Sequence, residues 1–158
     1  MNGIAIRPVR PDELGTVAEL RWRWAREIHG APDTTLEEFT PRFVTWALEN
    51  ESSHRCLVIV RDDLVIGMAW LAITRRVPHP RAFERASGDV QCVYVVPDVR
   101  DGGLGGQLID AVLVLARDLG LERVTVHSSE RAVSAYSRHG FALSPLLLQT
   151  DVMPSRAG

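Results

Sequence analysis

The feature that most constrains the fold is a strand pattern, a glycine-rich turn and a helix pattern in direct succession. The β-branched run of residues 93–96 stops at Pro97, four glycines fall between positions 102 and 106, and apolar residues then recur at helical spacing up to Leu119. Bare backbone N–H groups at the start of a helix bind anions, because no side chain shields them and the helix dipole adds positive charge. The sequence therefore predicts that a phosphate group binds at this turn.

Two common phosphate-binding motifs do not fit the turn. A Walker loop needs Lys followed by Ser or Thr after its last glycine, but Gly106 is followed by Gln107 and Leu108. A dinucleotide fingerprint needs a third glycine where this chain has Leu108, and it belongs near the first strand of its fold. Nucleotide hydrolysis and hydride transfer are therefore not favoured. The remaining alternative to a ligand site is a turn that only lets the helix pack closely on the strand.

Length and composition bound the class of protein. The chain has 158 residues, enough for one domain with a full core, so we expect a single domain over residues 1–158. A formal net charge of −2 argues against nucleic acid as a partner, and no apolar run approaches the roughly 20 residues that span a membrane. Cys56 and Cys92 lack metal-ligand spacing, so we expect no metal site and a reduced, cytoplasmic protein. Homodimer formation stays open.

Strand and helix patterns follow one another in the order β-α-α-β-β-β-α-β-α-β, with room for one more strand. Thr35 and Glu38 have the spacing of a capping box, but Pro41 favours a second helix whose regular part starts near Thr40. Residues 75–88 show little periodicity and are predicted to form a loop. Only the later crossovers can be parallel, so we expect an α/β fold with a mixed sheet. The expected strands are 4–7, 55–61, 64–74, 89–96, 123–127 and one or two within 141–152, and the other expected helices are 12–28, 103–119 and 132–139.

Two motifs of the chain resemble those of the GNAT superfamily of N-acetyltransferases. The acetyl-CoA signature of that family is similar to the run Val95-x-Pro97-x-x-Arg100-x-x-Gly103-x-Gly105. A later family motif matches Ser129-x-x-Ala132-x-x-x-Tyr136-x-x-x-Gly140-Phe141, at the expected distance downstream. The element order fits the family over nearly the whole chain. The resemblance implies the GNAT acyl-CoA N-acyltransferase fold and an enzyme with acetyl-CoA as co-substrate and no metal.

The resemblance also implies where the donor lies. In this family the CoA diphosphate lies over the turn, the pantetheine arm pairs with the preceding strand, and a backbone N–H near Val95 polarises the thioester. Asp101 departs from the family pattern, and we expect its carboxylate to point outward. A bulge opens this strand in the family, whereas simple alternation predicts Gln91, Val93 and Val95 on one face. The matching candidates for cofactor binding are Val93, Tyr94, Val95, Arg100, Asp101, Gly102, Gly103, Leu104, Gly105 and Gly106.

Tyr136 and Ser129 are the candidates in the second motif. Tyr136 stands where many family members place the tyrosine that protonates the departing CoA thiolate. A phenol has a reference pKa near 10 and a thiol near 8.5, so full proton transfer is uphill by roughly 2 kcal/mol and a hydrogen bond to the thiolate is the alternative. Ser129 stands where the family most often has an Asn that contacts the pantetheine. The structural alternatives are packing for Tyr136 and capping of the following helix by Ser128 or Ser129.

The general base is less well defined than the donor site. Asp89 lies four residues before Val93, the offset of the glutamate base in histone-type relatives. His127 ends the next expected strand, and histidine changes its charge near neutral pH. Glu84 and His79, in the adjacent loop, and a chain of water molecules are further candidates. Each of these side chains also has a purely structural explanation as a surface or strand-end residue.

The acceptor is expected to be a primary amine of a small molecule. In such folds the first two helices and the loop before the fourth strand build its pocket. Those segments offer aromatic residues and Glu27, which suit a cationic amine, and arginines, which suit a carboxylate or phosphate. Because neither cysteine has an evident base beside it, we expect direct attack of the amine in a ternary complex. The alternatives are a protein N-terminal or lysine acetyltransferase and a non-catalytic acyl-CoA-binding sensor.

Overall fold

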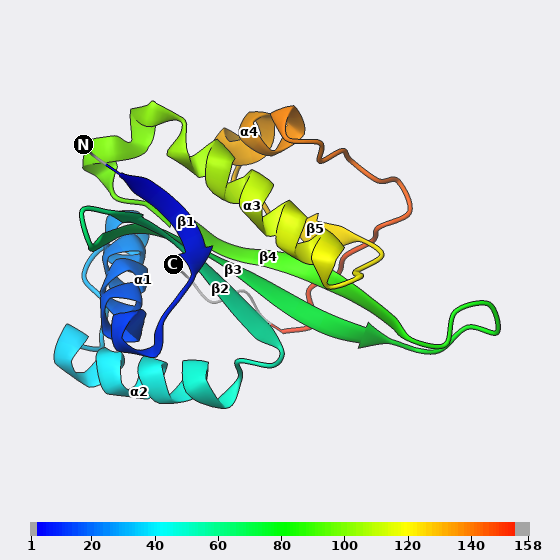
Figure 1. The fold of residues 1–158 in the computed structure, drawn as a ribbon, viewed down its shortest axis with the longest axis horizontal. Coiled ribbons are helices and arrows are strands. Elements are labelled where there is room, and N and C mark those ends of the chain that lie inside the picture. Colours follow the sequence, from blue (N-terminus) through cyan, green and yellow to red (C-terminus); the bar gives the residue numbers. More distant parts are fainter. Residues whose placement is uncertain (1–2, 154–158) are drawn as a thin grey trace.

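The computed structural model describes residues 3–153, apart from the side chain of Asp101. Its centre is a sheet in the order β1-β2-β3-β4-β5 (Figure 1). β4 is antiparallel to β3 and parallel to β5, and the remaining neighbours are antiparallel. The mixed sheet expected from the sequence is therefore confirmed. The strands are β1 (Ile4–Pro8), β2 (His54–Arg61), β3 (Leu64–Arg76), β4 (Arg85–Val95) and β5 (Val124–Val126).

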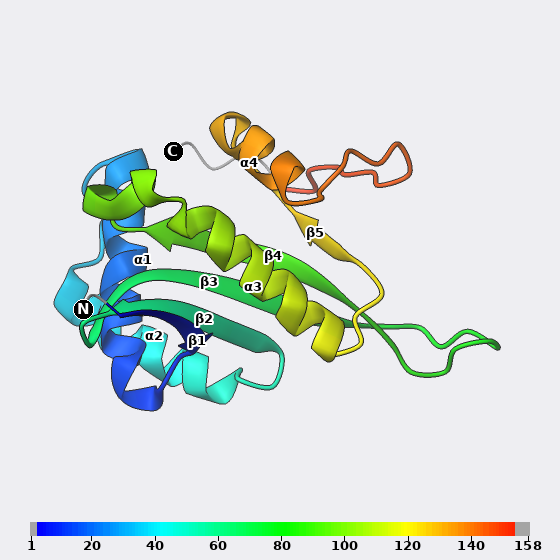
Figure 2. The same cartoon turned by 45° about the horizontal axis from the view of Figure 1, so that its top comes forward.

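Helices cover both faces of the sheet (Figure 2). One face packs against α1 (Leu14–His29) and α2 (Leu36–Glu49), around the buried side chains of Met68 and Trp70. The other face packs against α3 (Leu104–Asp118), whose Leu108 and Val112 lie one turn apart and are almost fully buried. The short helix α4 (Val133–Arg138) contacts α3. The sheet thus separates two apolar clusters, and β4 contributes to both.

The second helix starts earlier than expected. It begins at Leu36 rather than near Thr40, because the Thr35 hydroxyl caps it by accepting a hydrogen bond from the Glu38 N–H at 3.2 Å. Pro41 therefore lies inside the helix. The cap satisfies a backbone donor that would otherwise have no partner, and this outweighs the preference of proline for the first turn.

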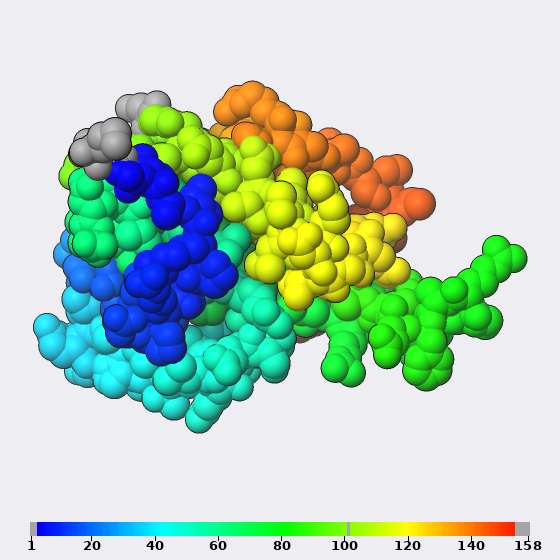
Figure 3. Space-filling view, viewed as in Figure 1, coloured from blue at the N-terminus to red at the C-terminus, as the bar shows by residue number. Residues whose placement is uncertain are grey.

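The predicted loop at 75–88 is mostly a hairpin. Residues 74–76 of β3 pair with 85–87 of β4, and only 77–84 connect the two strands. The Arg85 guanidinium holds the base of this arm through Glu122, with Nη2 and Oε1 2.9 Å apart. The arm projects from the body of the molecule (Figure 3). The two ends of the expected loop therefore pair with each other and lengthen β3 and β4. Only the connection between these strands stays irregular.

The strands expected within 141–152 are not formed. Residues 142–153 contain a turn at Pro145 and Leu146 and otherwise no helix or strand. In both ribbon views the segment leaves α4 without joining the sheet (Figures 1 and 2). A strand pattern gives a strand only where a partner strand supplies hydrogen bonds, and no other described segment pairs with this one. The prediction of one or two last strands is therefore wrong for the single chain.

Candidate functional site

A bulge interrupts the pairing of β4 with β3. Met68 pairs with Tyr94 and Trp70 pairs with Gln91, so two residues of β4 stand opposite the single residue Ala69 of β3. One of the two is Cys92, whose φ of 56° lies in the left-handed region that non-glycine residues seldom adopt. A bulge of this kind bends the strand and redirects its side chains. The bulge that the family resemblance implied is therefore present.

The bulge changes which β4 side chains share a face. Val93 and Val95 pack in the cluster under α3, whereas Cys92 and Tyr94 pack in the cluster under α1 and α2. Gln91 pairs with a residue of the α1 and α2 cluster, so it lies on that face too. The expectation that Gln91 shares the face of Val93 and Val95 is therefore wrong. Simple alternation fails because the bulge inserts an extra residue between them.

Beyond the bulge one edge of β4 is open. β5 pairs with β4 only as far as Val90. Further along, the Val96 N–H donates to the Ile66 carbonyl of β3 at 3.0 Å. Backbone groups alternate along a strand, so those of Val93 and Val95 point away from β3, to the side where β5 no longer pairs. This open edge lies where the resemblance places the pantetheine arm.

The glycine turn leads from this edge into α3. A short 3₁₀ segment (Pro97–Gly102) ends at Gly103, whose φ is 75°. Glycine adopts this left-handed conformation without strain because it has no Cβ. The first hydrogen bond into α3 joins the Gln107 N–H to the Gly103 carbonyl at 3.2 Å. The N–H groups of Leu104, Gly105 and Gly106 therefore have no partner within the helix. Unpaired N–H groups at a helix N-terminus are what an anion site requires, so phosphate binding at this turn stays a prediction.

Two glycines of the turn serve different purposes. A Cβ built on Gly105 would meet no atom within 4 Å, so the protein itself leaves space there for a ligand. A Cβ on Gly106 would lie 2.6 Å from Nε2 of His139, so this glycine lets the α4 end of the chain pack on α3. The His139 Nδ1 also lies 2.7 Å from the Asp110 carboxylate, one turn further along α3. This contact was not found from the sequence, although Gly106 and Asp110 have the helical spacing that places both beneath one side chain.

Arg100 fastens the turn to α1 and β4. Its Nε donates to the Val95 carbonyl and its Nη2 to the Glu27 carboxylate, each at 2.8 Å. The Tyr94 hydroxyl donates to the other Glu27 oxygen at 2.5 Å. Burial alone would raise the pKa of Glu27, but the hydrogen bonds from Tyr94 and Arg100 outweigh it and lower that pKa. Glu27 is thus ionised and already paired, so it holds the donor turn rather than standing free for a cationic acceptor.

Tyr136 is buried, with its ring edge against Phe141 at a centroid distance of 5.4 Å. Burial raises the pKa of its hydroxyl, and the nearby Cys92 thiol raises it further. The phenol therefore stays protonated and can donate a hydrogen bond. Ser129 is exposed and precedes a short 3₁₀ segment (Glu130–Ala132), and its side chain makes no capping hydrogen bond. Helix capping by Ser129, the structural alternative to a ligand contact, is thus not seen.

The two candidate bases differ in their surroundings. Asp89 is half-buried and accepts hydrogen bonds from the Gln91 amide at 3.0 Å and from the Thr125 hydroxyl at 3.2 Å. It therefore lies on the α1 and α2 face, one residue before Val90, the last residue of β4 that pairs with β5. His127 is exposed and follows β5 directly. The side chain of Asp101, which we expected to point outward, lies outside the described part of the structure.

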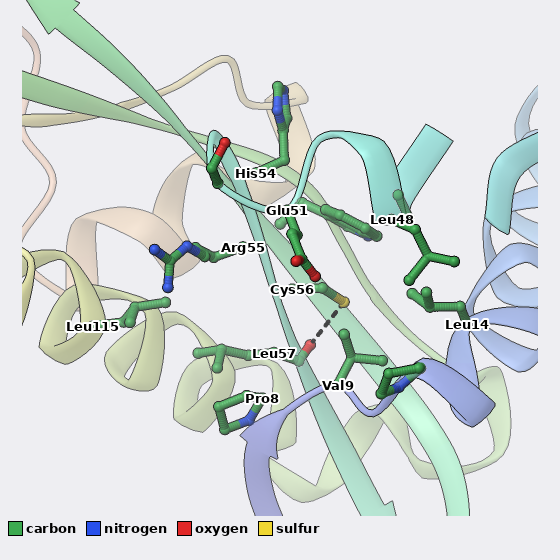
Figure 4. Close-up of a pocket in the computed structure, with 14 residues that line it drawn as sticks. Pro8, Val9, Leu14, Leu48, Glu51, His54, Arg55, Cys56, Leu57 and Leu115 are labelled. Carbon is green, nitrogen blue, oxygen red and sulfur yellow. Dashed lines mark hydrogen bonds between the residues drawn. The ribbon is translucent and has the colours of Figure 1, made fainter. Parts of the chain in front are cut away.

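A cavity of about 470 Å³ lies away from this site (Figure 4). It opens where β1 ends, between the start of β2 and the end of α2, and Cys56 lines it. Burial raises the pKa of the Cys56 thiol, so this cysteine stays protonated. None of the residues that line the cavity belongs to β4, to the glycine turn or to α4. The cavity is therefore separate from the residues of the two sequence motifs.

Comparison with known proteins assigns the chain to a family. Residues 16–141 match the model of the acetyltransferase (GNAT) family, so the chain belongs to that family of enzymes. A mycothiol acetyltransferase of Propionibacterium freudenreichii subsp. shermanii is 31% identical over 61% of this chain and 29% of its own length. An amino-acid acetyltransferase of Edwardsiella ictaluri is 32% identical over 65% of this chain and 20% of its own length. The chain thus spans less than a third of either curated relative.

Solved structures support the same fold. A predicted acetyltransferase of Clostridium acetobutylicum, crystallised with acetyl-CoA, superimposes with a TM-score of 0.77 over 95% of this chain and 97% of its own, at 13% identity. An acetyltransferase of Trypanosoma brucei gives a TM-score of 0.72 over 95% of this chain and 100% of its own, at 23% identity. The GNAT fold implied by the two motifs is therefore confirmed.

Among residues 3–153 no helix has both the length and the apolar character to cross a membrane. The same residues hold no group of three or more His, Cys, Asp or Glu side chains that could bind a metal ion.

Proposed function

We propose that this protein transfers the acetyl group of acetyl-CoA to a primary amine of a small molecule, as a single-domain cytoplasmic enzyme. The observation that carries the proposal is the path from the open edge of β4 to the unpaired N–H groups at the start of α3. A donor with a thioester at one end of an extended arm and a diphosphate at the other fits such a path. The names of the two curated relatives refer to mycothiol and to amino acids, which supports a small acceptor.

The backbone binds most of the donor in this proposal. The N–H groups of residues 104–106 donate to the diphosphate, with Gly102 and Gly103 beside them. The pantetheine amides pair with the open edge of β4, and the exposed side chain of Ser129 contacts the same arm. The N–H of Val95 polarises the thioester carbonyl as an oxyanion donor does. Arg100 positions this edge and the turn through its bonds to Val95 and Glu27.

The reaction proceeds by direct attack in a ternary complex. The amine nitrogen forms a bond with the thioester carbon, and the bond between that carbon and the CoA sulfur breaks. The amine proton passes to Asp89 or, by the alternative route, to His127. The thiolate of CoA leaves with its negative charge stabilised by a hydrogen bond from Tyr136. Burial raises the pKa of the Cys92 thiol, so this cysteine stays protonated and is a poor nucleophile for an acetyl-enzyme.

Asp89 is the preferred base because two hydrogen bonds hold its carboxylate one residue before the point where β5 stops pairing with β4. The test compares pH profiles of kcat/KM for the wild type, Asp89→Asn and His127→Gln. Loss of the base should lower kcat/KM about 100-fold and remove the acidic limb of the profile. We expect this for Asp89→Asn and an unchanged profile for His127→Gln. The reverse result assigns the base to His127, and two unchanged profiles leave proton removal to water.

The acetyl transfer itself is tested by incubating the protein with acetyl-CoA and a panel of small primary amines, following release of the CoA thiol. Turnover with at least one amine is expected. Tight binding of acetyl-CoA without turnover on any amine would instead indicate a non-catalytic sensor. Acetylation of lysines or N-termini in a protein extract, without turnover on small amines, would indicate a protein acetyltransferase.

A further inference from the structure

Arg21 interrupts the apolar stripe by which α1 packs on the sheet. Leu14 and Val17 of this stripe are buried. Trp24, three residues after Arg21, packs in the same cluster. Residues three and four apart lie on one face of a helix, so Arg21 also faces the sheet, and its side chain is half-buried. Arginine is seldom buried without a partner, so this position needs an explanation other than packing.

The guanidinium of Arg21 lies against the bulge of β4. α1 and the end of β4 run in the same direction, because Trp24 packs on Tyr94 at a centroid distance of 6.5 Å and Glu27, further along α1, bonds the glycine turn beyond the strand. One helical turn advances about 5.4 Å and two strand residues about 6.6 Å, so the turn before Trp24 lies level with Cys92. Burial raises the pKa of the Cys92 thiol, and the positive charge of Arg21 acts in the opposite direction, which agrees with this placement.

Arg21 has no anionic partner in the described part of the chain. Its guanidinium carbon lies 4.8 Å from the centroid of the Trp24 ring, and none of the ion pairs among residues 3–153 includes it. The carboxylates of Glu27 and Asp89, on the same side of β4, are each held by two hydrogen bonds from other residues. Within the described residues a positive charge is therefore left without a counterion beside the bulge.

The proposed reaction takes place at the same part of β4. The Cys92 thiol lies near the Tyr136 hydroxyl and raises its pKa, so Cys92 is close both to Arg21 and to the proposed donor of the hydrogen bond to the thiolate. The thioester carbonyl is assigned to the N–H of Val95, three residues further along the strand. An amine that attacks this thioester therefore brings its other substituents within reach of Arg21.

We propose that Arg21 binds an oxyanion of the acceptor, so that the acceptor is a small primary amine that also carries a carboxylate or a phosphate. This inference rests on the proposed acetyl transfer. A guanidinium donates two parallel hydrogen bonds to either oxyanion, and stacking on Trp24 fixes the plane of these donors. A neutral amine leaves the charge of Arg21 unpaired. Arg21 is thus a specificity-determining residue, and Asp89 is left to accept the proton of the amine.

The test measures steady-state kinetics on matched acceptors at saturating acetyl-CoA. One pair is an amino acid and its amide, and the other is an aminoalkyl phosphate and the corresponding amino alcohol. Each acceptor is compared between the wild type and Arg21→Gln, so that its own amine reactivity cancels. We expect Arg21→Gln to raise the KM of the anionic acceptor about 30-fold with little change in kcat, because a charge-assisted pair of hydrogen bonds is lost. The neutral acceptor should be unaffected, and the pair that responds distinguishes a carboxylate from a phosphate.

Arg26→Gln is the matched control. Arg26 belongs to the same helix and its guanidinium carbon lies 5.0 Å from the centroid of the Trp22 ring, but its side chain is exposed. The variant loses the same charge and the same kind of stacking, and it should keep the KM of every acceptor. Arg21→Lys keeps the charge without the planar donors, so it should retain part of the preference for the anionic acceptor. It also carries the test if Arg21→Gln does not fold.

The outcomes separate this inference from the proposed function. Equal effects of Arg21→Gln on the anionic and neutral acceptors, or the same effect in Arg26→Gln, overturn the inference and leave acetyl transfer in place. If no amine is acetylated, the proposed function fails, and calorimetric titration of the CoA-bound protein with the same compounds tests Arg21 directly. The anionic compounds should then bind the wild type more tightly than the neutral ones, and Arg21→Gln should remove the difference. Equal binding of both kinds to the wild type overturns the inference.

Discussion

The glycine turn and the 142–153 segment are left incomplete in opposite ways. At the turn the incomplete groups are polar, namely three backbone N–H groups at the start of α3, with open space in front of Gly105. In the segment they are apolar, namely leucines, a valine and a methionine without cover. The turn is held firmly from behind by Arg100 and Glu27, whereas the segment has no regular structure of its own.

The difference indicates what each region binds. Fixed N–H donors around open space select a small anionic group, because directional hydrogen bonds reward a ligand of one shape and charge. Exposed apolar side chains on an extended segment gain most from a broad surface, because the hydrophobic effect scales with buried area and has little directionality. Substitutions in one region should therefore leave the function of the other unchanged.

The largest expected effect separates the two regions most sharply. Gly105→Asp places a carboxylate in the open space at the start of α3, close to where the diphosphate is proposed to lie. Two like charges about 4 Å apart near a protein surface repel by about 4 kcal/mol, so the affinity for acetyl-CoA should fall on the order of 1,000-fold. Isothermal titration calorimetry measures this loss, and sedimentation should show the same oligomeric state as in the wild type.

Stability provides the control for this substitution. A Cβ at position 105 meets no atom, and an acidic residue in the first turn of a helix is favourable, so urea unfolding should show no loss of stability. Gly3→Asp is a matched variant, because a Cβ at Gly3 likewise meets no atom within 4 Å but Gly3 precedes β1. Unchanged acetyl-CoA affinity in Gly105→Asp would contradict the assignment of the diphosphate to the turn.

Tyr136 lies between the two regions, because its ring packs on Phe141 at the root of the segment. Tyr136→Phe keeps that packing and removes only the hydroxyl. If the hydroxyl stabilises the departing thiolate, kcat should fall about 100-fold while the Kd of acetyl-CoA changes little. Steady-state kinetics and calorimetry on the same samples check this. Equal losses in kcat and affinity would instead show that Tyr136 only shapes the donor site.

The parts of the site that depend on local sequence were predictable. A strand, four glycines and a helix pattern place free N–H groups at a helix start wherever the chain folds, so the unpaired N–H groups of residues 104–106 followed from spacing alone. Tyr136 was singled out by its motif, and its catalytic role stays a prediction. Contacts between distant segments were not predictable. Nothing near Glu27 in the sequence indicates its pairing with Arg100, and His139 gave no sign of packing on Gly106.

The errors have a common cause, which is that strand structure depends on a partner. Simple alternation placed Gln91 wrongly because the bulge at Cys92 exists only in the pairing of β4 with β3. Residues 75–88 show weak periodicity although they include the ends of two paired strands. Their backbone pairing with each other, and not an alternating side-chain pattern, forms the hairpin. The strand pattern of 141–152 forms no strand in the single chain because no edge of that chain is paired with it. An alternating sequence pattern shows that a segment can form a strand, and the presence of a pairing partner decides whether it does.

The smallest expected effect distinguishes the two neighbouring glycines. Alanine is favoured over glycine inside a helix by about 1 kcal/mol, so Gly105→Ala should raise the free energy of unfolding by up to that amount. Gly106→Ala should lose this gain and destabilise the protein by about 1 kcal/mol instead, because its Cβ would lie 2.6 Å from Nε2 of His139. Urea unfolding of both variants measures the difference.

Adding His139→Ala to Gly106→Ala should relieve the clash and restore part of the stability. If Gly106→Ala is as stable as Gly105→Ala, close packing of His139 on Gly106 does not require a glycine there. Both glycines would then be needed only for ligand binding.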